Sequence, residues 1–324
     1  MRSLSLSGFL LLLCGISSGV LATFTINIDY SYDEDTANGG LNFFDPLSSD
    51  GLMARTTLEA AADEIEQWIT DPFVAINPGG SNTYGALFFD PTDSGSATQT
   101  ETDLYVAANS ITIFAGAFTG GSASLLGQGG KGGHIDLMGS ASFIDSVATR
   151  GGEAFETMWG GMIRFNADRT DWHLDSLSLP GSTEYDFYTV AIHELLHVVG
   201  IGQCTCWDNQ VSGGEFSGSF SVAKYNETDA DTANDLNPVP LGDSDHWDNS
   251  VMSVVAEDGV TPQEVLMGPS LDQGTRLELT ELDLAGLADL EWNIVGINPI
   301  PEPAFAGLAL GLVTLLWLRI RQGK

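Results

Sequence analysis

The residues best suited to chemistry are two histidines and a glutamate in the segment His193-Glu194-Leu-Leu-His197. On a helix, residues four positions apart share a face, so both imidazoles can bind one metal ion while Glu194 reaches a water molecule beside it. The chain contains only five histidines, so this spacing seldom arises by chance. The motif predicts a metal-binding helix on which Glu194 acts as a general base.

A catalytic zinc ion needs a third protein ligand and an open position for water. His246 is the one remaining histidine that follows the helix, because His134 and His173 precede it in loop-like sequence. For those two histidines we expect solvent or a local hydrogen bond as partner. The other possible ligands are carboxylates and thiols that follow the helix: Asp208, Asp245, Cys204 and Cys206.

The segment from His193 to Gln203 resembles the metal-binding motif of the metzincin metallopeptidases, in which a glycine permits a turn after the helix. Gly200 stands at that place. Metzincins carry the third ligand three residues later, where this chain has Gln203, and a neutral amide is a poor zinc ligand. Leishmanolysin-like metzincins instead have a large insertion between the glycine and the third histidine. The resemblance therefore implies that His246 is the third ligand.

Two further features of the metzincin family have counterparts here. The resemblance implies a methionine turn beneath the metal, for which Met267 in Val-Leu-Met267-Gly-Pro is favoured over its competitor Met252. It also implies a strand at the sheet edge that pairs with extended substrate, since an exposed edge offers main-chain donors and acceptors to any peptide. An ordinary strand is the alternative. The residues of this strand are Gly161, Met162, Ile163, Arg164 and Phe165.

The resemblance spans roughly residues 24–293 and implies a zinc-dependent endopeptidase that hydrolyses polypeptides with a metal-activated water. It also implies an α+β fold of the metzincin type, with a twisted mixed sheet, an active-site helix and a C-terminal helical subdomain. Gln203 supports an alternative function that is not enzymatic: a non-catalytic envelope protein on the same scaffold that binds surface polymer or calcium. Hydrolysis of a non-peptide amide or ester would use the same residues.

Hydrophobic periodicity predicts the elements that must position these residues. It indicates strands at 24–30, 111–115 and 162–165 and an amphipathic helix over 58–69. The metal-binding helix covers 184–199 and ends at a glycine. Segment 127–133 is predicted as a glycine-rich loop, and 203–245 as a long loop or insertion. A capping-box variant at Thr280 and Asp283 begins a last helix that leads to Trp292. This order favours one α+β domain over residues 23–298.

Two of the three cysteines lie close together after the helix, as Cys204-Thr-Cys206. A disulfide across a single intervening residue is strained. We therefore predict two free thiols or a local redox or metal-binding pair.

Both ends of the chain have the composition of sorting segments. Residues 1–22 contain Arg2 and a short apolar run, which is typical of a secretory signal peptide. Residues 299–324 contain a Pro-Glu-Pro linker, an uncharged run at 304–318 too short for a typical span, and a basic tail. They resemble the PEP-CTERM sorting signal, which implies an exosortase partner, transient anchoring in the inner membrane and an envelope or extracellular location. A plain membrane anchor is the alternative.

The charge of the chain narrows the choice of partners. It has 44 acidic and 11 basic residues among 324, a formal charge of −33, yet 43% of its residues are hydrophobic. Without segments 1–22 and 301–324, seven basic and 43 acidic residues remain, a charge of −36. A nucleic-acid partner is excluded by repulsion, and cationic or neutral polypeptides are favoured. The acidic clusters 29–35 and 229–235 could bind calcium, but solvated loops are expected because both lack the calcium-loop pattern.

Overall fold

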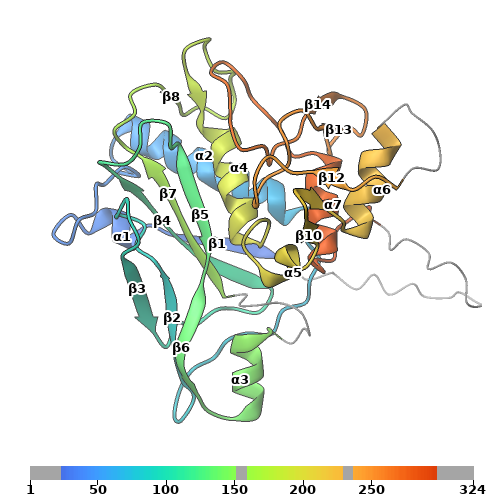
Figure 1. Ribbon diagram of the computed structural model, residues 1–324. Coiled ribbons are helices and arrows are strands. Elements are labelled where there is room, and N and C mark those ends of the chain that lie inside the picture. Colours follow the sequence, from blue (N-terminus) through green and yellow to red (C-terminus); the bar gives the residue numbers. More distant parts are fainter. Residues whose placement is uncertain (1–22, 151–158, 229–235, 298–324) are drawn as a thin grey trace, which may run out of the picture.

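The computed structural model describes residues 23–150, 159–228 and 236–297, and its centre is a four-stranded mixed sheet (Figure 1). The strand order is β1-β4-β7-β5. Strands β1 (Thr25–Asp29), β4 (Ser110–Phe118) and β7 (Gly160–Asn166) run parallel, and β5 (Gly127–Lys131) is antiparallel to β7 at one edge. The strands predicted at 24–30, 111–115 and 162–165 are confirmed.

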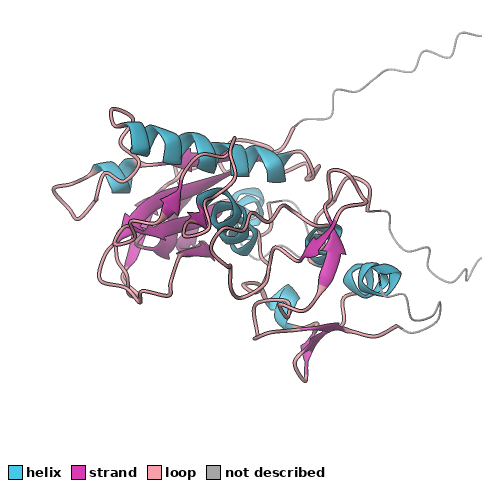
Figure 2. Ribbon diagram, turned by 90° about the horizontal axis from the view of Figure 1, so that it is seen from above, coloured by secondary structure: helices cyan, strands magenta, loops and turns pink. Residues whose placement is uncertain are grey.

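Alternation along β4 and β7 sends side chains to two separate hydrophobic cores. Ile113 and Ile163 point into the main core, which they share with helices α2 (Ser49–Glu66) and α4 (Phe187–Val198). Figure 2 shows the longest helix, α2, running along one side of the sheet. Phe114 and Met162 point the other way, into a second core against the sheet β3-β2-β6. That sheet consists of β2 (Thr83–Phe89), β3 (Thr98–Thr102) and β6 (Gly133–Met138).

The two long helices agree with their predicted positions. Helix α2 begins before the predicted 58–69 stretch, because Ser48 caps it by accepting a hydrogen bond from the Gly51 backbone. Helix α4 begins after Asp186, whose carboxylate accepts from the Thr189 backbone. Gly200 has φ +120°, a value that favours glycine, so the predicted stop after α4 is confirmed.

The mixed α/β architecture, with several sheets, is compatible with the predicted α+β class.

The remaining elements are short: α1 (Ser31–Glu34), α3 (Ala141–Ala148), β8 (Trp172–His173), β9 (Tyr185–Asp186), α5 (Thr205–Asp208), β10 (Val211–Ser212), β11 (Glu215–Phe216), α6 (Ser219–Thr228), β12 (Val239–Pro240), β13 (Met252–Val254), β14 (Pro262–Glu264) and α7 (Glu281–Asp289).

For segment 203–245 the sequence predicts a long loop or an insertion. The loop alternative is wrong for the described part, which contains α5, α6 and strands β10 to β12. Most of these elements are too short to show periodicity. Helix α6 is longer, but the residue that caps its first turn is distant in the sequence. Asp289 of α7 accepts hydrogen bonds from the backbones of Phe220 and Ser221, at 2.9 and 2.8 Å. A cap supplied by another helix leaves no local signal in the sequence.

The glycine-rich segment 127–133 is a second correction, because it is not a loop but strand β5 and the start of β6. The glycines permit close approach to other segments. A Cβ atom on Gly129 would lie 1.9 Å from the backbone oxygen of Glu194, and one on Gly132 would lie 2.0 Å from the Trp159 ring. Glycine is needed here so that β5 can lie directly against the metal-binding helix.

The strand assigned to the sheet edge is a third correction. Strand β7, which contains residues 161–165, lies between β4 and β5 and is buried throughout. The edge strands of this sheet are β1 and β5. Strand β5 lies against α4, and three of its five residues are glycines, so its sequence shows no strand periodicity. Arg164 is accordingly buried, and its guanidinium donates to Gln128 of β5 and to backbone carbonyls of residues 90–95.

The last helix, α7, has the predicted capping box, with Thr280 and Asp283 each accepting a hydrogen bond from the other's backbone. It ends at Asp289 and does not reach Trp292. The indole of Trp292 instead donates to the carbonyl oxygen of Val199 at 2.8 Å, which ties the end of the domain to the end of α4.

The predicted signal peptide, residues 1–22, and the predicted sorting signal, residues 299–324, lie outside the described residues. Within the part of the chain that the structure describes, no helix combines the length and hydrophobicity needed to cross a membrane.

The close contact of β5 with α4 can be tested by adding one methyl group. We expect Gly129→Ala to destabilise the protein by about 1–3 kcal/mol, since its Cβ would overlap the Glu194 carbonyl. Gly130→Ala is the matched control, because its Cβ would meet only Phe89, at 3.9 Å. Denaturant unfolding of both variants measures the difference; equal stabilities would contradict the packing argument.

Candidate metal centre

Helix α4 carries His193, Glu194 and His197, and all three line the same cavity. A buried ion pair fixes the first turn of this helix. Asp186, at 0% exposure, caps the helix and forms a two-point pair with Arg276 at 2.7 and 2.9 Å. A bidentate pair of this kind fixes orientation as well as position. The helix that carries the candidate ligands therefore starts from a rigid point.

Three histidine nitrogens converge at one point. The Nε2 atom of His246 lies 3.1 Å from Nε2 of His197 and 3.2 Å from Nε2 of His193. Among the described residues, these three form the one group of His, Cys, Asp or Glu residues whose ligand atoms lie close enough together to hold a metal ion. The structure thus joins His246 to the two helix histidines across 49 residues of sequence.

The other ring nitrogens show which tautomer each histidine adopts. Nδ1 of His193 lies 3.0 Å from the carbonyl oxygen of Leu266, and Nδ1 of His197 lies 2.8 Å from that of Ile201. A carbonyl oxygen can only accept, so both Nδ1 atoms carry the hydrogen and both Nε2 atoms present a lone pair. Nδ1 of His246 likewise donates to the carboxylate of Asp243, at 2.8 Å.

The Nε2 lone pairs of His193 and His197 both face Nε2 of His246, and one cation bound by all three nitrogens would satisfy this arrangement. The protonation of the site agrees with this arrangement. Burial lowers the pKa of His193 well below its ordinary value, and burial lowers the pKa of His197 to about 4. Neutral imidazoles are the form that binds metals. The residues therefore fit a divalent metal ion bound by three nitrogens.

Glu194 lies between the triad and the edge strand and is 7% exposed. Burial raises the pKa of its carboxyl group to about 8, against the opposing effects of a hydrogen bond from the Gly129 backbone and the charge of Arg164. A group that exchanges protons near neutral pH is suited to general acid–base catalysis. Its position beside the three histidines is the one the sequence motif predicts.

A cavity of about 570 Å³ opens over these residues. Its walls come from β5 and the loop before it, from α4, and from the segments around His246 and residues 266–271. Gln203 and Asp245 also line it. The third nitrogen beside those of His193 and His197 belongs to His246, and among the described residues Asp245 is part of no group of His, Cys, Asp or Glu that could hold a metal ion. Of the other histidines, His173 contacts Ser178 and Glu184, as expected for a local partner, and His134 lies on β6.

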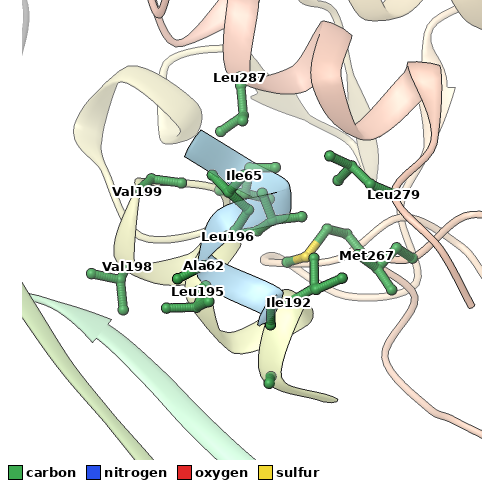
Figure 3. Packing of buried hydrophobic residues seen from close by; sticks show 14 of the residues in the cluster. Ala62, Ile65, Ile192, Leu195, Leu196, Val198, Val199, Met267, Leu279 and Leu287 are labelled. Carbon is green, nitrogen blue, oxygen red and sulfur yellow. The ribbon is translucent and has the colours of Figure 1, made fainter. Parts of the chain in front are cut away.

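The two candidate methionines differ sharply in environment. Met267 is fully buried, and Figure 3 shows its side chain directed toward Ile192 and Leu196 of α4. Its carbonyl oxygen accepts a hydrogen bond from the backbone of Trp247, the residue after His246. Met252 is 45% exposed on β13. The position beneath the metal-binding helix therefore belongs to Met267.

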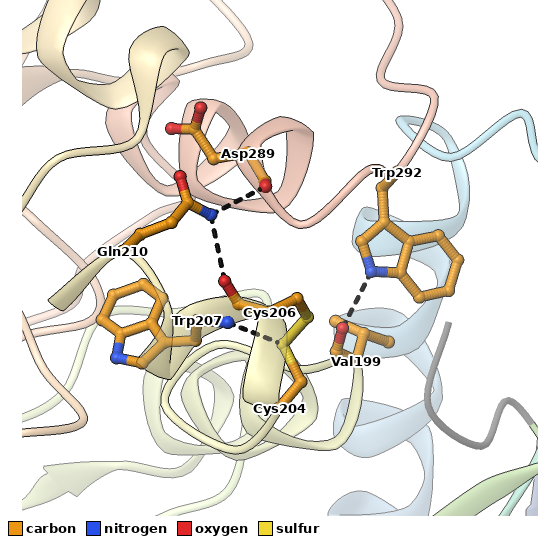
Figure 4. The surroundings of a disulfide bond; sticks show 7 residues. All are labelled: Val199, Cys204, Cys206, Trp207, Gln210, Asp289 and Trp292. Atoms are coloured by element: carbon orange, nitrogen blue, oxygen red, sulfur yellow. Dashed lines mark hydrogen bonds between the residues drawn. A yellow bond between two sulfur atoms is a disulfide. The ribbon is translucent and has the colours of Figure 1, made fainter. Parts of the chain in front are cut away.

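The prediction of free thiols at Cys204 and Cys206 is wrong, because the two form a disulfide (Figure 4). Cys204 is extended and caps α5, whereas Cys206 lies in the helix, so the chain turns between them. The turn brings the Cα atoms to 5.1 Å, within the range that a disulfide spans. Because both sulfur atoms belong to the disulfide, neither cysteine is available as a thiolate ligand.

The acidic segment 29–35 shows no ligand cluster among the described residues. Its carboxylates accept backbone hydrogen bonds instead: Asp29 accepts from Ser31, and the buried Asp33 accepts from Phe44. The second acidic segment, 229–235, lies outside the described residues.

Comparison of the chain with known protein families, with curated proteins and with solved structures finds no match in any of the three. The case for a function therefore depends on the geometry of the site.

Sequence reasoning missed three groups that hold the site residues: the carboxylate of Asp243 beside His246, the carbonyl of Leu266 beside His193, and the backbone of Gly129 beside Glu194. The Asp243-x-x-His246 spacing was a usable signal for the first, because a carboxylate often orients a ligating histidine. The other two are main-chain groups, which carry no residue-type signal.

The triad predicts one metal ion per chain. We expect the protein to bind one equivalent of Zn²⁺ or Co²⁺, and His246→Ala to lose most of that affinity, because two imidazoles remain. Saturating metal at about 100 times Kd should stabilise the folded protein by about 2.7 kcal/mol. His173→Ala is the control and should bind normally. Titration followed by calorimetry checks both; unchanged binding by His246→Ala would exclude this residue as a ligand.

Proposed function

We propose that this protein is a zinc-dependent endopeptidase. The observation that carries the proposal is the convergence of three histidine Nε2 atoms beside Glu194 in one cavity. Four-coordinate zinc with Zn–N bonds of about 2.0–2.1 Å sets its nitrogen ligands about 3.3–3.4 Å apart. The distances of 3.1 and 3.2 Å in the triad are close to this value.

Each group of the site has a role in peptide hydrolysis. When bound, a zinc ion supplies Lewis acidity that lowers the pKa of a coordinated water and polarises a carbonyl group. Glu194 takes a proton from the attacking water and passes it to the leaving amine. Leu266, Ile201 and Asp243 keep the three imidazoles in the tautomer that directs Nε2 toward the centre.

The edge strand gives the cleft a means of holding an extended peptide. Among the described strands, β5 pairs in its sheet with β7 alone. A substrate strand would add on the side away from β7, where the Gly129 backbone already donates to Glu194. Residues 126–129 line the cavity next to His193 and Glu194. A substrate strand added there would be recognised through its backbone, which is compatible with many sequences. We therefore assign the pairing with extended substrate to β5, in place of residues 161–165.

The resemblance to metzincins extends the proposal to the fold type, to a methionine turn at Met267 and to a third ligand placed as in leishmanolysin-like members. The buried position of Met267 and the long segment before His246 support it. The terminal segments support export and an exosortase-type partner, followed by release into the envelope or the medium.

Replacing the general base separates catalysis from folding. We expect Glu194→Gln to reduce peptide hydrolysis at least about 1000-fold, since proton transfer contributes about 10²–10⁴-fold and the amide cannot accept the proton. Zinc content and melting temperature should stay close to those of the wild type. Digestion of casein and a peptide library, with and without a chelator, measures the loss. Wild-type turnover by this variant would contradict the mechanism, and an inactive wild type with bound zinc would favour a non-catalytic binding protein.

The acidic surface predicts which substrates are captured fastest. Residues 23–300 carry a formal charge of −36, so a peptide with added lysines should have a lower KM than the same peptide with added glutamates. The difference should shrink as salt rises from 0.05 to about 0.5 M, because screening removes long-range attraction. Initial rates on the two matched peptides check this; equal KM values at low salt would refute electrostatic selection.

A further inference from the structure

The carboxylate of Asp283 is a second buried acidic group close to the metal centre, and it has more partners than a helix cap needs. It is 0% exposed in the first turn of α7. Its Oδ2 accepts from the backbone and hydroxyl of Thr280, at 3.1 and 2.6 Å. Those two bonds complete the cap. Three further donors come from outside the helix.

Two of these donors belong to the segment beneath the triad. The backbone N–H groups of Leu266 and Met267 donate to Asp283 at 3.2 and 3.3 Å. The carbonyl oxygen of Leu266 is the acceptor that orients His193. The carboxylate therefore holds the peptide segment that sets the direction of one ligand.

The third donor belongs to the residue next to another ligand. The indole Nε1 of the fully buried Trp247 donates to Asp283 Oδ1 at 3.1 Å. The backbone of Trp247 also donates to the carbonyl of Met267 at 3.0 Å. The segment that carries His246 and the segment that orients His193 thus meet at a single carboxylate.

We propose that Asp283 is a positioning residue for the metal centre, which fixes His193 and His246 relative to each other without touching the metal. The proposal rests on metal binding by the triad, and does not require peptidase activity. The hydrogen bonds also explain why residue 283 is an aspartate. All five partners are donors, so the site needs a group that only accepts. An asparagine would turn its NH₂ group toward at least two of those donors in either orientation.

The same helix supplies a matched control for this substitution. Asp289 is also a partly buried aspartate on α7 whose carboxylate accepts hydrogen bonds, in its case from Phe220 and Ser221 of α6. The hydrogen bonds given to its carboxylate come from α6, and none of them comes from the Leu266 segment or from Trp247. Asp289→Asn should therefore destabilise the fold through a lost cap while it leaves the metal centre intact.

The test compares Asp283→Asn and Asp289→Asn in the purified protein. Affinity for Zn²⁺ is measured by competition with a chromophoric chelator, and ligand geometry by the visible absorption spectrum of bound Co²⁺. We expect Asp283→Asn to bind Zn²⁺ about 10–100-fold more weakly and to show an altered Co²⁺ spectrum. Asp289→Asn should match the wild type in both measurements, even where its melting temperature falls. Wild-type affinity and spectrum in Asp283→Asn would overturn the proposal.

A second variant decides the question if Asp283→Asn does not fold. Trp247→Phe removes one outside donor and keeps an aromatic ring, so we expect a smaller loss of affinity and a Co²⁺ spectrum that differs from the wild type. Trp159→Phe in the second core is its control for lost volume. Identical metal binding by these two variants would overturn the proposal. Peptide hydrolysis is measured separately, so an inactive but metal-binding wild type would contradict the proposed function alone.

Discussion

Nε2 of His246 lies at hydrogen-bond distance from the Nε2 atoms of both His193 and His197, and several distant contacts hold the three rings in this arrangement. Each ring is held by its other nitrogen, which donates to Leu266, Ile201 or Asp243. These acceptors belong to three different parts of the chain. Loss of any one acceptor would permit the other tautomer of that ring, which has a hydrogen in place of a lone pair on Nε2. The site therefore depends on long-range packing more than on the helix motif itself.

Two buried carboxylates carry much of this packing, and both join segments that lie far apart in sequence. Asp186 starts α4 and pairs with Arg276, 90 residues later. Asp283 gathers the segments that contain Leu266 and Trp247. Burial of a carboxylate is unfavourable unless its oxygens are fully bonded. Each of these groups satisfies that condition with several donors, so each specifies one arrangement of its neighbours.

Close backbone approach is the other means by which the site is built. The edge strand β5 can lie against α4 because Gly129 has no side chain to meet the Glu194 carbonyl. Gly202 similarly allows the chain after α4 to approach Asp245, since a Cβ there would lie 2.6 Å from the Asp245 oxygen. The disulfide between Cys204 and Cys206 follows two residues later, at the start of α5.

The sequence by itself determined the parts of this protein that depend on local order. The 3.6-residue period predicted α2 and α4, the capping box predicted the start of α7, and the spacing of His193 and His197 predicted a shared metal-binding face. These features follow from interactions between residues three or four positions apart, which a single sequence displays. The third ligand needed the additional resemblance to a family with a long insertion.

Only the tertiary structure decided what depends on contacts between distant segments. The glycines of β5 read as a loop, because the helix that requires their small size lies more than 50 residues away. Strand β7 read as an edge, since hydrophobic content alone does not reveal neighbours on both sides. Asp283 read as a cap, because its other donors are two backbone amides and an indole that the fold brings to it. Main-chain donors have no sequence signature, so their partners become visible only when the chain is folded.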